Sequence, residues 1–132
     1  MKKLLLITLV LISTYHTVHA QKDNNKQVLR HVVMFGWKEG TDPAYINKIV
    51  NAFGNLPDKI ALIKSFEWGT NNSPENLNQG LSHCFLLTFN SEADRDAYLI
   101  HPDHKAFVAL LNPSPDKVTV FDYWAVSNNT LK

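Results

Sequence analysis

Short segments rich in β-branched and aromatic residues recur along the chain and predict four β-strands. They lie at 28–37, 65–68, 81–89 and 117–126, and the segment 65–68 is the shortest. In the first and third segments, apolar side chains occupy both sets of alternate positions, so both faces of these strands are apolar. Such strands are typical of a sheet that is covered on both sides.

A first helix is predicted between the first two strands. Asp42 followed by Pro43 is typical of a helix start, and apolar residues then recur with helical spacing as far as Gly54. Pro57 follows closely and argues against a simple continuation of this helix. The later segment 69–80 is polar and rich in Asn, and a loop of this length often covers a site.

A second helix is predicted to be interrupted by a proline. Ser91 supplies an N-cap hydroxyl, and Asp94 follows three positions later, as in a capping box with Asp in place of Glu. Pro102 removes an interior backbone hydrogen bond, so we expect a kink or a restart there before the apolar helical stretch 105–111.

The predicted order is strand, helix, strand, strand, helix, strand, which is the ferredoxin-like β-α-β-β-α-β arrangement of an α+β domain. Its four-stranded antiparallel sheet carries both helices on one face and leaves the other face bare. Here the bare face would be apolar, and a single copy should not expose so large an apolar patch. We therefore expect a homodimer whose two sheets face each other and form a dimeric α/β barrel.

Composition and charge narrow the class of protein further. A length of 132 residues fits one domain, and 45% apolar with 19% charged residues excludes an intrinsically disordered chain. Five Gly, six Pro and one Cys exclude collagen-like and disulfide-scaffold proteins. The formal net charge of +1 gives no indication of a nucleic-acid partner.

The first 20 residues are predicted to be a secretory signal peptide. Two lysines precede an apolar run over 4–12, and 18–20 forms a small-x-small cleavage site. The run is far shorter than the roughly 20 residues of a transmembrane helix, so we expect an exported protein, periplasmic or secreted, that does not associate with a membrane after cleavage. The predicted organisation is a signal peptide at 1–20, a flexible leader at 21–27, the domain at 28–126 and a frayed tail at 127–132.

Four histidines follow the predicted signal peptide: His31, His83, His101 and His104. A metal site is the first chemical possibility to consider for them. His101 and His104, with His83 and Cys84, are possible ligands, but no CxxC or HExxH motif accompanies them. His83 and Cys84 also point to opposite faces of one strand, so we expect no metal. A free thiol in an oxidising compartment survives best when buried, and we therefore expect Cys84 to lie inside the domain.

Acid–base chemistry fits these residues better. An imidazole takes and gives a proton near neutral pH. Tyr98 and His104 flank the proline break closely enough to share a cavity wall, and a tyrosine hydroxyl can donate to a developing enolate oxygen. Asp103 and Asp122 could orient an imidazole, although a cap or a surface charge is the commoner role. No GxSxG motif, phosphate-binding loop or dinucleotide fingerprint is present, and no cofactor is expected.

Four segments together resemble the stress-responsive dimeric A/B barrel (Dabb) family. They are HVVMFGWKEGT, GLSHCFLLTFNS, AYLIHPDHKAFV and VFDYW, and the resemblance covers roughly 28–124. It implies a ferredoxin-like fold and a dimer whose sheets form a barrel. One plant member of the family is a polyketide cyclase that closes a linear polyketide by aldol condensation without a cofactor.

The resemblance also implies roles for individual residues. The pocket histidines and tyrosine of the plant cyclase match His31, His83, Tyr98 and His104. His104 would then be the general base, and Tyr98 would hold substrate and base by hydrogen bonds. His31 and His83 would line or support the pocket. The leading hypothesis is an exported homodimer that binds a small apolar carbonyl or phenolic ligand and acts on it by proton transfer.

Two other functions stay open, so the sequence does not decide whether the protein is an enzyme. A non-catalytic stress or interaction protein would use the same histidines for packing and hydrogen bonding. A cofactor-free oxygenase on a similar dimeric barrel is the weakest of the three hypotheses, because no residue specifically predicts it.

Overall fold

The computed structural model describes residues 27–126 and shows one antiparallel sheet with helices on one side. Within the sheet the strand order is β2-β3-β1-β4, which confirms the predicted ferredoxin-like arrangement. Along the chain the elements are β1 (Leu29–Gly36), α1 (Pro43–Gly54), α2 (Leu56–Lys59), β2 (Ser65–Thr70), β3 (His83–Phe89), α3 (Glu92–Ile100), α4 (Pro102–Ala109) and β4 (Lys117–Trp124).

The segments predicted to flank the domain lie outside the described residues. These segments are the signal peptide at 1–20, the leader as far as residue 26 and the tail at 127–132. Between residues 27 and 126, no helix is long and apolar enough to cross a membrane.

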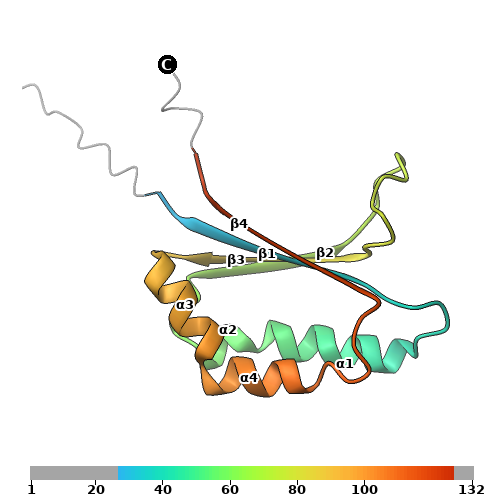
Figure 1. Ribbon diagram of the computed structural model, residues 1–132, viewed down its shortest axis with the longest axis horizontal. Helices are drawn as coiled ribbons and strands as arrows, with labels where there is room; N and C mark the ends of the chain where they lie inside the picture. The colour runs from blue at the N-terminus through green and yellow to red at the C-terminus, as the bar shows by residue number, and fades with distance from the viewer. Residues whose placement is uncertain (1–26, 127–132) are drawn as a thin grey trace, which may run out of the picture.

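The helices cover one face of the sheet (Figure 1). A largely aromatic core fills the space between these two layers. Phe53 of α1 lies in the middle of this core. Its ring centroid is 4.5 Å from that of Phe85 on β3 and 4.5 Å from that of Phe107 on α4. One ring therefore joins the sheet to two helices.

Two of the predicted helix starts are confirmed by their caps. The Asp42 carboxylate accepts a backbone hydrogen bond at the start of α1, where Pro43 is the first residue, and the helix ends at Gly54. The Ser91 hydroxyl accepts the N–H of Asp94 at the start of α3. Both caps satisfy backbone donors that would otherwise have no partner.

Proline explains one confirmed prediction and one omission. The expected restart occurs at Pro102, which is the first residue of α4, and His101 separates this helix from α3. The sequence predicts only a break at Pro57, yet Pro57 lies in the first turn of the short helix α2. Proline is well tolerated there, because the first N–H groups of a helix have no intrahelical partner.

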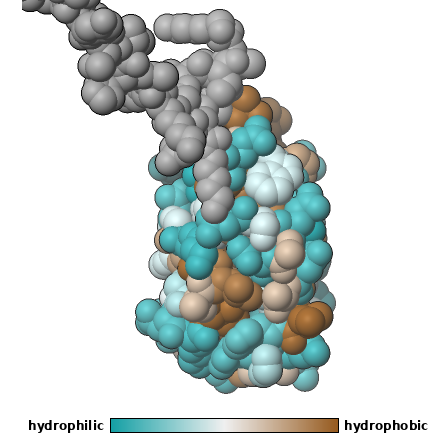
Figure 2. Space-filling view, turned by 90° about the vertical axis from the view of Figure 1, so that its left-hand side faces the viewer, coloured by the Kyte–Doolittle hydropathy of each residue, from teal (hydrophilic) through white to brown (hydrophobic). Residues whose placement is uncertain are grey.

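The sheet face opposite the helices is uncovered and largely apolar. Val32, Met34 and Leu86 are half-buried on it, while Phe121 and Tyr123 of β4 are exposed. By contrast, the end of the molecule near α3 is mainly hydrophilic, apart from a small hydrophobic area over the helix layer (Figure 2).

The prediction that Cys84 lies inside the domain is wrong for the single chain. Cys84 is exposed, because the alternation of β3 directs Phe85 and Leu87 into the core and Cys84 to the bare face. Partial shielding from water by its neighbours, together with the negative charge of Glu67, nevertheless raises the pKa of the exposed Cys84 thiol.

Gly36 ends β1 where the loop before β3 crosses it. A Cβ atom at position 36 would lie 2.5 Å from the carbonyl oxygen of Gly80. Lys117 holds the same loop by donating from Nζ to the carbonyl oxygen of Gln79. The loop can approach the sheet this closely only because residue 36 has no side chain.

We predict that Gly36→Ala lowers the free energy of unfolding by about 1–3 kcal/mol, because backbone must move to relieve the clash. Equilibrium urea denaturation measures this change. Gly69→Ala is the matched control, since a Cβ at position 69 meets nothing within 4 Å. Equal stability of the two variants would contradict the proposed clash.

Candidate active site

Three of the four residues predicted for the site lie together under the helix-facing side of the sheet. The ring centroids of His31 on β1 and Tyr98 on α3 are 5.9 Å apart, and those of Tyr98 and His104 on α4 are 4.4 Å apart. We call these three residues the acid–base cluster. The helix restart at Pro102 contributes to this cluster. The chain changes direction between α3 and α4, and this places the ring of His104 against that of Tyr98.

Tyr98 brings a buried hydroxyl that lacks a hydrogen-bond partner. The residue is fully buried, and its hydroxyl oxygen contacts no donor or acceptor among the described residues. Burial raises the pKa of Tyr98 far above its ordinary value, so the hydroxyl stays protonated and can donate. An unsatisfied buried hydroxyl costs about 1–3 kcal/mol of stability.

His104 has one ring nitrogen committed and one left to act as a base. Its Nδ1 lies 3.0 Å from the carbonyl oxygen of Leu99, and a carbonyl only accepts, so Nδ1 carries the proton. The unprotonated nitrogen of the neutral ring is therefore Nε2. Burial lowers the pKa of His104, and the nearby His31 and His101 lower it further, while the bond to Leu99 opposes this shift. The imidazole is therefore neutral near pH 7, and its Nε2 has a lone pair that can accept a proton.

His31 is held from the neighbouring strand by a carboxylate. The register of β1 and β4 places His31 opposite Asp122, and His31 Nδ1 lies 2.6 Å from Asp122 Oδ1. The other oxygen, Oδ2, accepts a bond of 2.9 Å from the guanidinium of Arg95 on α3. Asp122 therefore orients the His31 imidazole, which is the less common of the two roles that the sequence allows for it.

His83 lies apart from the acid–base cluster. It pairs with Phe35, four residues along β1 from His31, which corresponds to about 13 Å of extended strand. Its Nδ1 accepts from Trp37 Nε1 at 3.1 Å and is 2.9 Å from the Ser82 hydroxyl. Burial lowers the pKa of His83.

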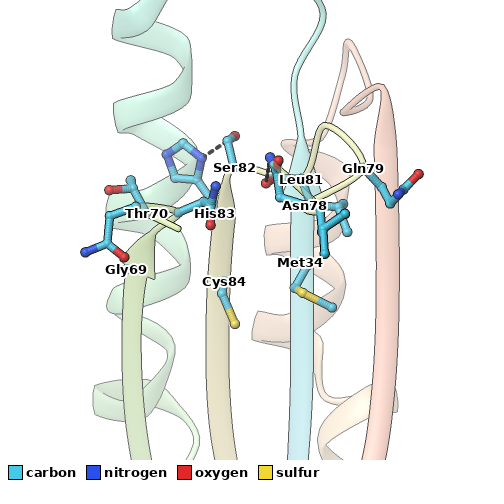
Figure 3. A pocket seen from close by; sticks show the side chains of 12 residues that line it. Met34, Gly69, Thr70, Asn78, Gln79, Leu81, Ser82, His83 and Cys84 are labelled. Atoms are coloured by element: carbon cyan, nitrogen blue, oxygen red, sulfur yellow. Dashed lines mark hydrogen bonds between the residues drawn. The ribbon is translucent and has the colours of Figure 1, made fainter. Parts of the chain in front are cut away.

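His83 instead borders an open cavity of about 510 Å³ between the sheet and the Asn-rich loop (Figure 3). Met34 and Cys84 lie on its sheet side, and the loop residues Asn78 and Gln79 lie across its upper end. A second cavity, of about 330 Å³, lies on the bare face beside Trp68 and Leu86. Neither cavity is lined by a member of the acid–base cluster.

Two further residues lie near the cluster: Asp103, for which the sequence favours a cap or a surface charge, and Arg95, which the sequence does not single out. Asp103 lies in the first turn of α4, where its N–H donates to His101 Nδ1 and its carboxylate Oδ2 lies 3.5 Å from the same nitrogen, so its contacts are with His101 and not with His31 or His104. Arg95 was missed, since an arginine among acidic residues on a helix usually marks a solvated face. In the part of the chain that the structure describes, no three His, Cys, Asp or Glu side chains come together to hold a metal ion.

Comparison with protein-family models identifies the domain. The model described as the stress responsive A/B barrel domain (Dabb) matches residues 29–125. The chain belongs to the Dabb family. The Dabb protein HS1 of Arabidopsis thaliana is 38% identical over 98 residues, which cover 74% of this chain and 90% of HS1. Olivetolic acid cyclase of Cannabis sativa is 26% identical over 95 residues, which cover 72% of this chain and 94% of the cyclase.

Solved structures show the same fold. A hydroxynitrile lyase from Passiflora edulis superposes with a TM-score of 0.72 at 27% identity, over 78% of this Dabb chain and 97% of the lyase. A dimeric ferredoxin-like protein from Jannaschia sp. superposes with a TM-score of 0.61 at 26% identity, over 73% of this chain and 97% of that protein. Proteins similar to this Dabb domain thus include dimers and two proteins named as enzymes.

We predict that His104→Gln makes the stability of the fold less sensitive to pH between about 7.5 and 5.5. The unfolded chain protonates this histidine near pH 6.5, whereas the folded chain does so only at lower pH, because burial lowers the pKa of His104. The unfolded state therefore binds more protons, and the histidine's contribution to stability is lost as the pH falls below about 6.5.

Urea denaturation at several pH values measures this effect. His83→Gln should reduce the pH dependence in the same direction, because burial lowers the pKa of His83 as well. Lys105→Gln changes an exposed neighbour of His104 and is the control, so the pH dependence of stability should be the same as in the native protein. An identical pH dependence in native protein and His104→Gln would contradict the neutral state assigned to His104.

Proposed function

We propose that the protein is a homodimer that uses the acid–base cluster, without a cofactor, to move a proton on a small apolar carbonyl or phenolic compound. The observation that carries this proposal is the unpaired buried hydroxyl of Tyr98 beside the neutral imidazole of His104. Such a reaction requires a hydroxyl donor and a basic nitrogen that are not already hydrogen-bonded, and here these are the Tyr98 hydroxyl and Nε2 of His104. The names of two relatives, a cyclase and a hydroxynitrile lyase, support an enzymatic role.

The proposed step is the removal of a proton from carbon next to a carbonyl group. Nε2 of His104 takes the proton as the carbon–hydrogen bond breaks, and the electron pair moves onto the carbonyl oxygen. The Tyr98 hydroxyl donates a hydrogen bond to that oxygen as its negative charge develops. His104 then returns the proton to the product. His31, held by Asp122, forms the opposite wall of the cluster.

The bare face of the sheet supports the homodimer. Phe121 is 61% exposed and Tyr123 is 41% exposed on this face, beside half-buried apolar side chains of β1 and β3. A second copy placed sheet to sheet would remove this apolar surface from water. Similar solved structures are dimeric ferredoxin-like proteins, which fits the same arrangement. We also propose export, on the basis of the signal-like first 20 residues.

A non-catalytic stress or interaction protein is the second candidate. The observation that favours it is that Tyr98 is fully buried and that neither cavity described above reaches it. On this reading the cluster only packs the helix layer onto the sheet. The two candidates differ in whether removal of the Tyr98 hydroxyl lowers a reaction rate, because only the catalytic candidate gives that hydroxyl a ligand to bind.

We predict that the protein accelerates the exchange of carbon-bound protons for deuterium in aryl ketones and aryl 1,3-diketones, followed by proton NMR in deuterated water. His104→Ala should lower the rate by about 10²–10⁴-fold. Tyr98→Phe should also lower the rate while raising the free energy of unfolding by roughly 1 kcal/mol, because it removes an unsatisfied buried group.

Lys105→Gln is the matched control for the exchange experiment and should keep the native rate, because its side chain is exposed outside the cluster. Exchange no faster than in buffer, with variants that alter thermal stability alone, would favour the non-catalytic candidate. A large destabilisation by Tyr98→Phe would show that the hydroxyl has a structural partner.

We predict that Phe121→Glu converts the dimer into single subunits, because it would place two charges in an apolar interface. Sedimentation equilibrium measures the mass directly. Ile100→Glu is the control, since Ile100 is 69% exposed at the end of α3, in the layer that faces away from the bare sheet. A native protein that sediments as one subunit would contradict the homodimer.

A further inference from the structure

We propose that Arg95 is a positioning residue for the acid–base cluster, which it serves by fixing the orientation of the Asp122 carboxylate that binds His31. This inference rests on the proposed function, because it concerns the protonation pattern of the same cluster. Arg95 contacts neither Tyr98 nor His104 through a hydrogen bond, and its effect passes entirely through the carboxylate.

The geometry is a linear chain of three side chains from three elements. The guanidinium of Arg95 on α3 donates to Asp122 Oδ2 at 2.9 Å, and Asp122 Oδ1 on β4 lies 2.6 Å from His31 Nδ1 on β1. Each carboxylate oxygen therefore has one partner. The other two donor nitrogens of Arg95 bind Asp96 Oδ1, at 3.0 and 2.8 Å, which fixes the guanidinium from the solvent side.

The chain runs from the surface into the core. The side chains of Arg95 and Asp122 are 21% and 26% exposed, whereas that of His31 is 5% exposed. Ion pairs gain strength as water is excluded, so the partly buried bond between Arg95 and Asp122 is more than a loose surface contact. A guanidinium only donates and never loses its proton, so any atom of residue 122 that it binds must be an acceptor.

The carboxylate that Arg95 holds in place sets the tautomer of His31. With both carboxylate oxygens accepting, Nδ1 of His31 carries the proton and Nε2 keeps its lone pair. His104 has the same pattern, because the carbonyl oxygen of Leu99 accepts from its Nδ1. The cluster thus offers two imidazole lone pairs and one hydroxyl donor, which suits a ligand with a carbonyl oxygen and a nearby hydroxyl or enol group.

The test exchanges one oxygen of residue 122 for an amide nitrogen. In Asp122→Asn, we expect Arg95 to claim the only oxygen, so that the amide N–H₂ faces His31 and its Nδ1 must become an acceptor. His31 then changes from the Nδ1–H to the Nε2–H tautomer. In the double variant Arg95→Met with Asp122→Asn, the amide is free to turn its oxygen inward, and the Nδ1–H tautomer should return in part.

Nitrogen-15 NMR of the imidazole rings at about pH 8, where histidines are mainly neutral, reports the tautomer directly. The His31 signals are assigned by their loss in His31→Gln, and the backbone amide spectrum shows that each variant is folded. Asp96→Asn is the matched control. It removes the second carboxylate bound to Arg95 but leaves the bond to Asp122, so the His31 tautomer should not change.

The same tautomer in Asp122→Asn and in the double variant would overturn the role of Arg95, as would retention of the Nδ1–H form in Asp122→Asn alone. A residue that merely stabilised the helix would change the unfolding midpoint without moving a tautomer. The NMR measurement needs no substrate, so a failure of the deuterium-exchange experiment would count against the proposed function alone.

Discussion

The pairing of β1 with β4 is the constraint on which the geometry of the acid–base cluster depends. It places His31 and Asp122 directly opposite each other on the helix-facing side of the sheet. Side chains alternate between faces, so a slip of one residue in this register would move Asp122 to the other side and leave the ring without its partner. The imidazole lies in an otherwise apolar core, where an unpaired ring nitrogen would be costly. The strand register therefore also decides which ring nitrogen of His31 faces the carboxylate.

Most of the fold could be predicted from local signals, because each signal has a local physical cause. Alternation marks the strands, side-chain oxygens mark the starts of α1 and α3, and Pro102 marks the restart at α4. Helix α2 was missed because Pro57 suits the first turn of a helix as well as it suits a break. The prediction for Cys84 was wrong for a different reason. It relied on the chemical vulnerability of a free thiol, whereas the alternation of β3 decides the face and directs Cys84 to the bare side.

The site was predictable only in part, because its contacts join residues that are distant in the sequence. Tyr98 and His104 are close along the chain, and the proline between them signalled that they could meet. Arg95 and Asp122 are 27 residues apart, and nothing local links them before the fold is known. His83 shows the opposite failure. Alternation places it on the same face as His31, but alternation carries no information about distance along the strand, and His83 lies at the other end of the core.

The unpaired Tyr98 hydroxyl sets stability against function at one position. Phenylalanine would fill the same space beside Phe89 and His104 without the desolvation cost of a hydroxyl, and a core selected for stability alone would favour it. Acceptors outside the cluster hold the ring proton of each neighbouring imidazole at Nδ1. The acceptor is a backbone carbonyl for His104 and a carboxylate for His31. Those bonds leave the hydroxyl as the cluster's donor and the two remaining imidazole nitrogens as its acceptors. Packing alone gains nothing from such an unsatisfied set, whereas the carbonyl ligand proposed above would complete it.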